Sequence, residues 1–376
     1  MKRVSGFFAS RAGIIIVGLV LGGLAATLQR LGNPPNMGIC VACFTRDIAG
    51  ALGLHRTAAV QYLRPEIPAL CLGAFVAALA FREFRPRTGS APIVRFVLGV
   101  FAMLGALIFL GCPWRALLRL AGGDWNAVLG LIGLAVGIGV GVQFLKAGFS
   151  LGRTYPTRTL AGLAMPAVMV ALLVLAIYYP SFAPKPATEA AGQAAASAPA
   201  PAALFLSKEG PGSKHAPVLY SIGAGLAIGF LAQRTRFCTV GGIRDVILMR
   251  DFHLLSGVVA FAAAALAMNL IWGKFHPGFA NQPIAHTTHW LNFAGMALAG
   301  LAFTLAGGCP GRQVFLSGEG DGDAAVFVLG MLAGAAVAHN FLTVGNTVNA
   351  AYAVVIGLVV VAAIGMLGRE KLPVAR

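Results

Sequence analysis

Long apolar stretches recur along the whole chain, separated by shorter segments that carry the polar residues. A stretch of about 20 apolar residues can cross a hydrocarbon core about 30 Å thick. These stretches show no period-two alternation, which favours helices over the strands of a barrel. We therefore predict an all-α polytopic membrane protein with about ten transmembrane helices, near residues 12–29, 65–81, 93–110, 125–146, 160–180, 216–232, 253–272, 290–306, 324–343 and 347–368.

Between some of these stretches lie more polar segments of about 8 to 15 residues, which are too short to span the membrane. Each predicts a re-entrant loop followed by a short helix. Glycines spaced by four predict close helix packing, at Gly133, Gly137, Gly141, Gly330 and Gly334. Four tryptophans near the ends of apolar stretches are expected at the membrane interface, namely Trp114, Trp125, Trp272 and Trp290.

A segment rich in alanine, proline, glycine and serine interrupts the pattern after the fifth stretch. Such a composition cannot bury a core and predicts a flexible linker. The predicted organisation is a first transmembrane half at residues 1–182, a linker at 183–216 and a second transmembrane half at 217–376.

Composition narrows the function classes. The 376 residues are 58% hydrophobic and 11% charged, whereas a soluble domain carries about 25% charged residues. This excludes a soluble enzyme, a nucleic-acid binder and a secreted disulfide scaffold. The net charge of +16 is typical of the positive-inside rule and contact with anionic lipids. We read Gly13–Leu28 as a retained first helix, because no small-residue cleavage site follows the basic start.

The two halves repeat one another. Two groups match at an offset of 198, Cys40, Arg46, Asp47 and His55 with Cys238, Arg244, Asp245 and His253. GCPWR at 111–115, leading to Asp124, recurs at an offset of 197 as GCPGR at 308–312, leading to Asp321. Two separate motifs at nearly one offset indicate an internal duplication.

An odd number of spans, five in each half, would insert the second half upside down relative to the first. With the amino terminus inside, the inner segments hold clearly more of the 28 lysines and arginines than the outer ones. We therefore expect both termini in the cytoplasm and the linker outside. The expected location is a bacterial inner membrane.

The Gly-Cys-Pro-x-Arg motif predicts an anion site. Proline favours the first position of a helix, which places Cys112 and Cys309 at the cap beside free N–H groups. Arg115 and Arg312 follow in the same turn. This surrounding favours a bound anion or a thiolate. We expect Asp124 and Asp321 to be the partners of the two arginines. Each acid could instead cap the next helix.

Two other groups allow more than one interpretation. Arg46–Asp47 and Arg244–Asp245 either neutralise each other or contribute arginines that collect the anion. Cys40 and Cys43 form a C-x-x-C, typical of a redox dithiol or half a zinc site. The second copy has Gly241 where Cys43 stands, so a zinc site would lack ligands. We expect no resident metal or cofactor.

Several motifs resemble the YeeE/YedE family of membrane proteins, and most closely its YedE branch, described as selenium transporters. They are NPPNMGICVACFTRDIAG (33–50), GCPWRALLRLAGGD (111–124), KAGFSLGR (146–153) and GGCPGRQ (307–313). The resemblance implies an hourglass-shaped helical protein with two pseudo-symmetric halves. It also implies thiosulfate uptake along cysteines through S–H···S hydrogen bonds, at Cys40, Cys112 and Cys309, with Cys238 as the fourth symmetry-related position. The family is linked with TusA-like sulfur-carrier proteins on the cytoplasmic side. Cys43 and the long linker depart from the thiosulfate pattern, so a selenium species fits equally.

The first hypothesis is a permease for a small sulfur- or selenium-containing anion. It performs no covalent chemistry and is not an enzyme. Its expected substrate pathway comprises Cys40, Cys112, Cys238, Cys309, Arg115, Arg312, Arg46 and Arg244. The main alternative is a membrane thiol-disulfide oxidoreductase that uses Cys40 and Cys43 with a quinone. A passive anion channel and a docking platform for a carrier protein are further alternatives.

Overall fold

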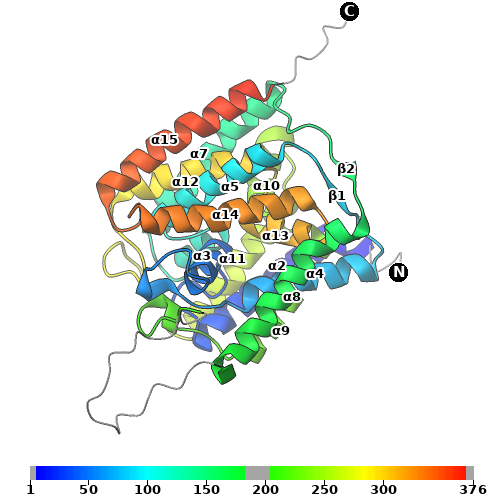
Figure 1. Ribbon diagram of the computed structural model, residues 1–376. Helices are drawn as coiled ribbons and strands as arrows, with labels where there is room; N and C mark the ends of the chain where they lie inside the picture. The colour runs from blue at the N-terminus through cyan, green and yellow to red at the C-terminus, as the bar shows by residue number, and fades with distance from the viewer. Residues whose placement is uncertain (1–5, 183–203, 370–376) are drawn as a thin grey trace, which may run out of the picture.

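A computed structural model describes residues 6–182 and 204–369 (Figure 1). This part of the chain is helical almost throughout. Its only paired strands are β1 (Arg87–Thr88) and β2 (Tyr155–Pro156), which lie antiparallel. Two short 3-10 turns, η1 (Ala58–Val60) and η2 (Pro211–Ser213), lie in the loops. The all-α prediction is confirmed.

Long and short helices follow one another in the same order in both halves. The first half contains α2 (Arg11–Arg30), α3 (Val41–Ala51), α4 (Glu66–Ala80), α5 (Pro92–Ile108), α6 (Pro113–Ala121), α7 (Asn126–Lys146) and α8 (Thr159–Phe182). The second contains α9 (Val218–Thr235), α10 (Thr239–Met249), α11 (His253–Ile271), α12 (His289–Ala306), α13 (Pro310–Gly318), α14 (Gly322–Asn340) and α15 (Thr347–Leu367).

Eight helical segments of the described residues are long and apolar enough to cross a membrane. Eight of the ten predicted stretches coincide with them. The other two form α4, which has only 15 residues, and α9, whose last turn carries Gln233 and Arg234. The chain is therefore a multi-pass membrane protein in which these two helices are the least typical spans.

The two halves interleave rather than form separate bundles (Figure 1). Helix α2 of the first half packs along α11 of the second, and α4 packs along α9. In the same way α5 packs along α14 and α7 along α12, while α5 and α12 also contact each other. Each half therefore supplies the surface on which the other buries its helices.

The glycines spaced by four lie at these contacts between the halves. A Cβ added at Gly133 or Gly137 of α7 would collide with a backbone carbonyl of α12. The matching Gly330 and Gly334 of α14 lie in the same way against carbonyls of α5. The predicted close packing is confirmed, and it joins one half to the other.

The predicted flexible linker is described only in its last part, because residues 183–203 lie outside the described ranges. From residue 204 onward the chain packs on the loop between α3 and α4. Leu204 is buried, and Ser207 Oγ accepts a 2.7 Å hydrogen bond from the Gln61 N–H. The segment that enters the second half is thus held by the first.

One interfacial prediction is wrong. The Trp114 side chain is only 1% exposed, whereas Trp125 and Trp290 are 45% and 53% exposed. Trp114 belongs to the short helix α6, in which every residue except Leu120 is buried. Its indole is consequently part of the core.

Candidate functional site

Four cysteines cap the four short helices. Cys112 and Cys309 precede Pro113 and Pro310 with extended backbone at the starts of α6 and α13, as the motif predicted. Cys40 and Cys238 occupy the same position at the starts of α3 and α10. Their sulfurs accept hydrogen bonds from backbone N–H groups in the first turn, at 3.4 Å and 3.2 Å respectively. Each thiol therefore lies at the positive end of a helix.

The four thiols form two buried pairs, one from each half. The Cys40 thiol donates to Cys112 Sγ over 3.7 Å. In the second half the Cys309 N–H donates to Cys238 Sγ over 3.4 Å. A disulfide would need the sulfurs about 2.05 Å apart, so Cys40 and Cys112 are in the contact expected of hydrogen-bonded thiols. All six cysteines of the chain are free and buried.

Arg115 lies directly beside the first thiol pair and is fully buried. Its Nη1 is 3.6 Å from Cys43 Sγ. Nε and Nη2 donate to the carbonyls of Asn36 and Ile284 over 3.3 Å and 2.9 Å. None of the salt bridges among the described residues includes Arg115. A buried guanidinium held only by carbonyls and a sulfur has an uncompensated charge, which favours a bound anion.

The backbone around Arg115 and Cys43 adopts strained conformations. The Cys43 thiol donates to the carbonyl of Leu110 over 3.7 Å. Leu110, Asn36 and Ile284 all have positive φ values, of 64°, 55° and 51°. Leucine and the β-branched isoleucine rarely adopt such values, and this strain is concentrated at functional sites. Three turns of chain are therefore bent to aim carbonyls at one thiol and one guanidinium.

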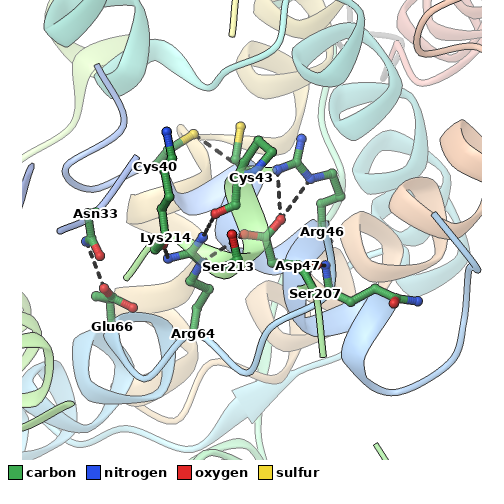
Figure 2. A network of polar contacts seen from close by, with 12 residues as sticks. Asn33, Cys40, Cys43, Arg46, Asp47, Arg64, Glu66, Ser207, Ser213 and Lys214 are labelled. Atoms are coloured by element: carbon green, nitrogen blue, oxygen red, sulfur yellow. Dashed lines mark hydrogen bonds and ion pairs between the residues drawn. The ribbon is translucent and has the colours of Figure 1, made fainter. Parts of the chain in front are cut away.

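A second cluster of charge lies farther along α3 (Figure 2). Asp47 Oδ1 accepts from Arg46 over 2.7 Å, and Oδ2 accepts from Arg64 over 2.8 Å. All three side chains are buried, so two cations share one carboxylate. Arg64 also donates to the carbonyls of Lys214 and Pro211. The motif pattern missed Arg64, since nothing in its local sequence marks it as a partner of Asp47.

The second half carries a weaker version of this cluster. Arg244 pairs with Asp245 at 2.8 Å, but the Arg244 side chain is 29% exposed. No other described arginine pairs with Asp245. Arg312, in the first turn after Cys309, pairs with Glu319 at 3.2 Å. The repeated motifs therefore have different charge environments, and the excess positive charge gathers at the first half's thiols.

Asp124 and Asp321 do not pair with the arginines expected for them. Asp124 binds Arg119 at 2.6 Å, and Asp321 binds Arg87 at 2.7 Å. Asp321 also caps α14 by accepting from the Ala324 N–H. The capping alternative is thus correct for Asp321, and Asp124 likewise accepts a 2.9 Å hydrogen bond from the Asn126 N–H at the start of α7.

A cavity of about 320 Å³ is lined by Leu110, the residue whose carbonyl accepts the Cys43 thiol. His286 and the residues 343–347 also lie in its wall. His286 Nε2 bonds the Ile108 carbonyl at 2.8 Å. Burial lowers the pKa of His286, and the nearby Arg119 lowers it further. This ring is therefore neutral at neutral pH.

The structure thus brings Cys40, Cys43, Cys112 and Arg115 into one cluster and Cys238 and Cys309 into a second. Arg46 lies one turn beyond Cys43 on α3 and is engaged by Asp47. Arg244 is the most exposed of the four arginines of the predicted pathway, and its side chain pairs with Asp245 rather than with a thiol.

Two comparisons with known proteins give matches. A family model described as sulphur transport matches residues 234–367. The matched region includes Cys238, Arg244, Cys309 and Arg312. This match confirms the resemblance to the YeeE/YedE sulphur transport family.

The second match is shorter. Over 64 residues the chain is 41% identical to "Fluoride-specific ion channel FluC 2" of Synechococcus sp. (strain CC9605), which covers 17% of this chain and 47% of that protein. The chain therefore spans about half the length of this relative. One match is thus described by sulphur transport and the other by an ion channel.

Proposed function

On the premise that the chain is a membrane transporter of the sulphur transport family, we propose that it is a permease for a small sulfur- or selenium-containing anion. Thiosulfate and selenium oxyanions such as selenite are the substrate class. The anion passes from Cys40 and Cys112 to Cys238 and Cys309.

The observation that carries this proposal is the buried Arg115 guanidinium beside Cys43 without a carboxylate partner among the described residues. A buried cation of this kind lowers its free energy by binding an anion. The helix starts at Cys40 and Cys112 add positive dipole ends. Sulfur and selenium anions are polarizable, and weak S–H donors suit them better than they suit strongly hydrated anions.

In this proposal the anion enters through the cavity lined by Leu110, whose carbonyl accepts the Cys43 thiol. Arg46, which follows Cys43 on α3, shares the Asp47 carboxylate with Arg64, and this excess of positive charge adds to the attraction for an anion. The second pair has a less positive surrounding, since Arg312 is neutralised by Glu319. A site that binds firmly at entry and weakly at exit lets the anion leave, which transport requires.

The proposed setting follows from the orientation expected from the sequence. The protein lies in a bacterial inner membrane with both termini in the cytoplasm, and the Cys238–Cys309 pair delivers the anion inward. A TusA-like sulfur-carrier protein receives the sulfur on that side. The permease makes and breaks no covalent bond, so it is not an enzyme.

Uptake into proteoliposomes tests the proposal. We expect uptake of radiolabelled thiosulfate or selenite that excess sulfate does not suppress. Cys112→Ala and Cys309→Ala should abolish it while the protein still inserts. Cys71→Ala is the matched control, because Cys71 is buried on α4 against Ser317 and lies in neither thiol pair. Normal uptake in both pathway variants would end the proposal.

The oxidoreductase alternative predicts a different thiol state. The Cys43 thiol donates to the Leu110 carbonyl, which favours a stable reduced form. Mass spectrometry after rapid thiol blocking should therefore find Cys40 and Cys43 reduced during transport. A Cys40–Cys43 disulfide that appears and disappears with quinone addition would favour the alternative.

A further inference from the structure

Trp114 lies where the two repeated motifs meet. It is the second residue after Cys112, and Gly311 is the second residue after Cys309. A Cβ added at Gly311 would lie 3.1 Å from Trp114 Cζ2 and 3.5 Å from Cε2. The indole of one half thus covers the position that the other half leaves without a side chain. A tryptophan at both positions would not fit.

The ring is enclosed by aromatic side chains of the second half. Its centroid lies 5.7 Å from that of Phe237, 5.9 Å from Phe261 and 6.0 Å from Phe315. Phe237 directly precedes Cys238. Trp114 is therefore attached to the first thiol pair by its chain and to the second by its contacts.

The indole N–H is the exceptional feature of this residue. Trp114 is 1% exposed, and its Nε1 has no hydrogen-bond partner among the described residues. Buried indole N–H groups ordinarily find an acceptor, and an unmet donor destabilises the folded state. A phenylalanine would fill the same apolar surroundings without that cost. The atoms nearest the Cβ position of Gly311 are Cζ2, Cη2 and Cε2, so the six-membered ring of the indole, which carries Nε1 on Cε2, lies against the first turn of α13.

We propose that the Trp114 indole N–H is a substrate contact that donates a hydrogen bond to the anion as it crosses from the Cys40–Cys112 pair to the Cys238–Cys309 pair. This inference rests on the proposed permease function. A single neutral donor holds an anion weakly. It therefore stabilises the crossing without trapping the substrate, as a step between two sites requires. The donor also favours an anion with an acceptor oxygen over a fully apolar solute.

Trp114→Phe keeps an aromatic ring and removes the donor. We expect the variant to insert normally and to melt at or above the wild-type temperature, because an unmet buried donor is gone. Loading at Cys40 and Cys112 is unchanged, so KM for thiosulfate should stay within about twofold while the maximal rate falls about tenfold. Trp125→Phe is the matched control and should transport as the wild type, since its indole is exposed. A Trp114→Phe variant with the wild-type maximal rate would overturn the proposal.

A fluorescence measurement separates this proposal from the permease itself. Replacing Trp125, Trp272 and Trp290 by phenylalanine leaves Trp114 as the only tryptophan of the chain. Thiosulfate should then change its emission, and sulfate should not. A change in emission from a protein that carries out no uptake would support the contact and refute the permease. Normal uptake with unchanged emission would refute the contact alone, and the absence of both would refute the two together.

Discussion

The Arg115 guanidinium and the Cys43 sulfur lie 3.6 Å apart in a fully buried cluster. Cys43 has no counterpart in the second half, where Gly241 stands, whereas Arg115 has one in Arg312. Arg312 is neutralised by Glu319, and Arg115 pairs with no carboxylate in the described ranges. Within the described residues, the duplicated motif therefore has an unpaired buried arginine in the first half and an ion-paired one in the second.

Replacing Arg115 should weaken binding of the transported anion. Hydrogen bonds to charged groups contribute about 1.5 to 3 kcal/mol, so Arg115→Gln should raise KM for uptake by about tenfold or more. Arg115→Lys keeps the charge but loses the planar fork, and we expect an intermediate value. Uptake kinetics in proteoliposomes measure both. An unchanged KM in Arg115→Gln would remove Arg115 from the binding site.

Oxidation should link Cys40 to Cys112. Their sulfurs are 3.7 Å apart, and a movement of less than about 2 Å brings them to bonding distance. In a Cys43→Ala background, a thiol oxidant such as copper phenanthroline should form this disulfide and stop uptake. Dithiothreitol should restore uptake. Peptide mapping by mass spectrometry identifies the bond, and in a variant that lacks both Cys43 and Cys112 the same oxidant should leave the Cys40 thiol reduced. Preferential pairing of Cys40 with any other cysteine would contradict the geometry.

Removing the Asp47 carboxylate should destabilise the fold. Asp47→Asn leaves Arg46 and Arg64 buried without a counter-charge, which costs about 3 to 5 kcal/mol. The matched variant Asp245→Asn affects a pair whose arginine is 29% exposed, and there we expect about 1 kcal/mol or less. Apparent melting temperatures in detergent compare the two. Equal decreases in melting temperature for the two variants would show that burial of the first pair adds nothing to the stability of the fold.

The contact between α7 and α12 should depend on Gly133. Gly133→Ala places a methyl group against the Phe293 carbonyl, and we expect a loss of about 1 to 3 kcal/mol from the separation of the helices. Gly139 of the same helix has open space around it, so Gly139→Ala should be neutral or slightly stabilising. Thermal unfolding of the two variants tests this. A Gly133→Ala protein as stable as the wild type would mean that the helices separate at little cost.

Much of the fold could be predicted because its signals are local. The length of an apolar stretch decides whether it spans, and nearly every predicted stretch became a long helix. The Cys-Pro pairs fixed the starts of α6 and α13, because proline at the first position leaves the preceding cysteine as the cap. The duplication could also be recognised from the sequence, because rare residues recur at nearly one spacing in the two halves.

The charge partners could not be predicted in this way. Asp124 and Asp321 bind Arg119 and Arg87, and Asp47 binds Arg64 in addition to its neighbour. Arg87 and Asp321 are far apart in the sequence and belong to different halves. Such pairs depend on which helices pack together, and sequence spacing carries no information on that.

The sequence by itself determined that this chain is a helical membrane protein with two related halves, each with two cysteines that cap short helices. It could do so because hydrophobic length, helix capping and internal repetition are properties of short segments. The tertiary structure alone decided how unequal the halves are. Interleaved packing sets Trp114 against Gly311, leaves Arg115 without a carboxylate and bends Leu110 toward Cys43. These relations arise where segments distant in the sequence pack densely against one another, and the local sequence of either segment does not specify its neighbour.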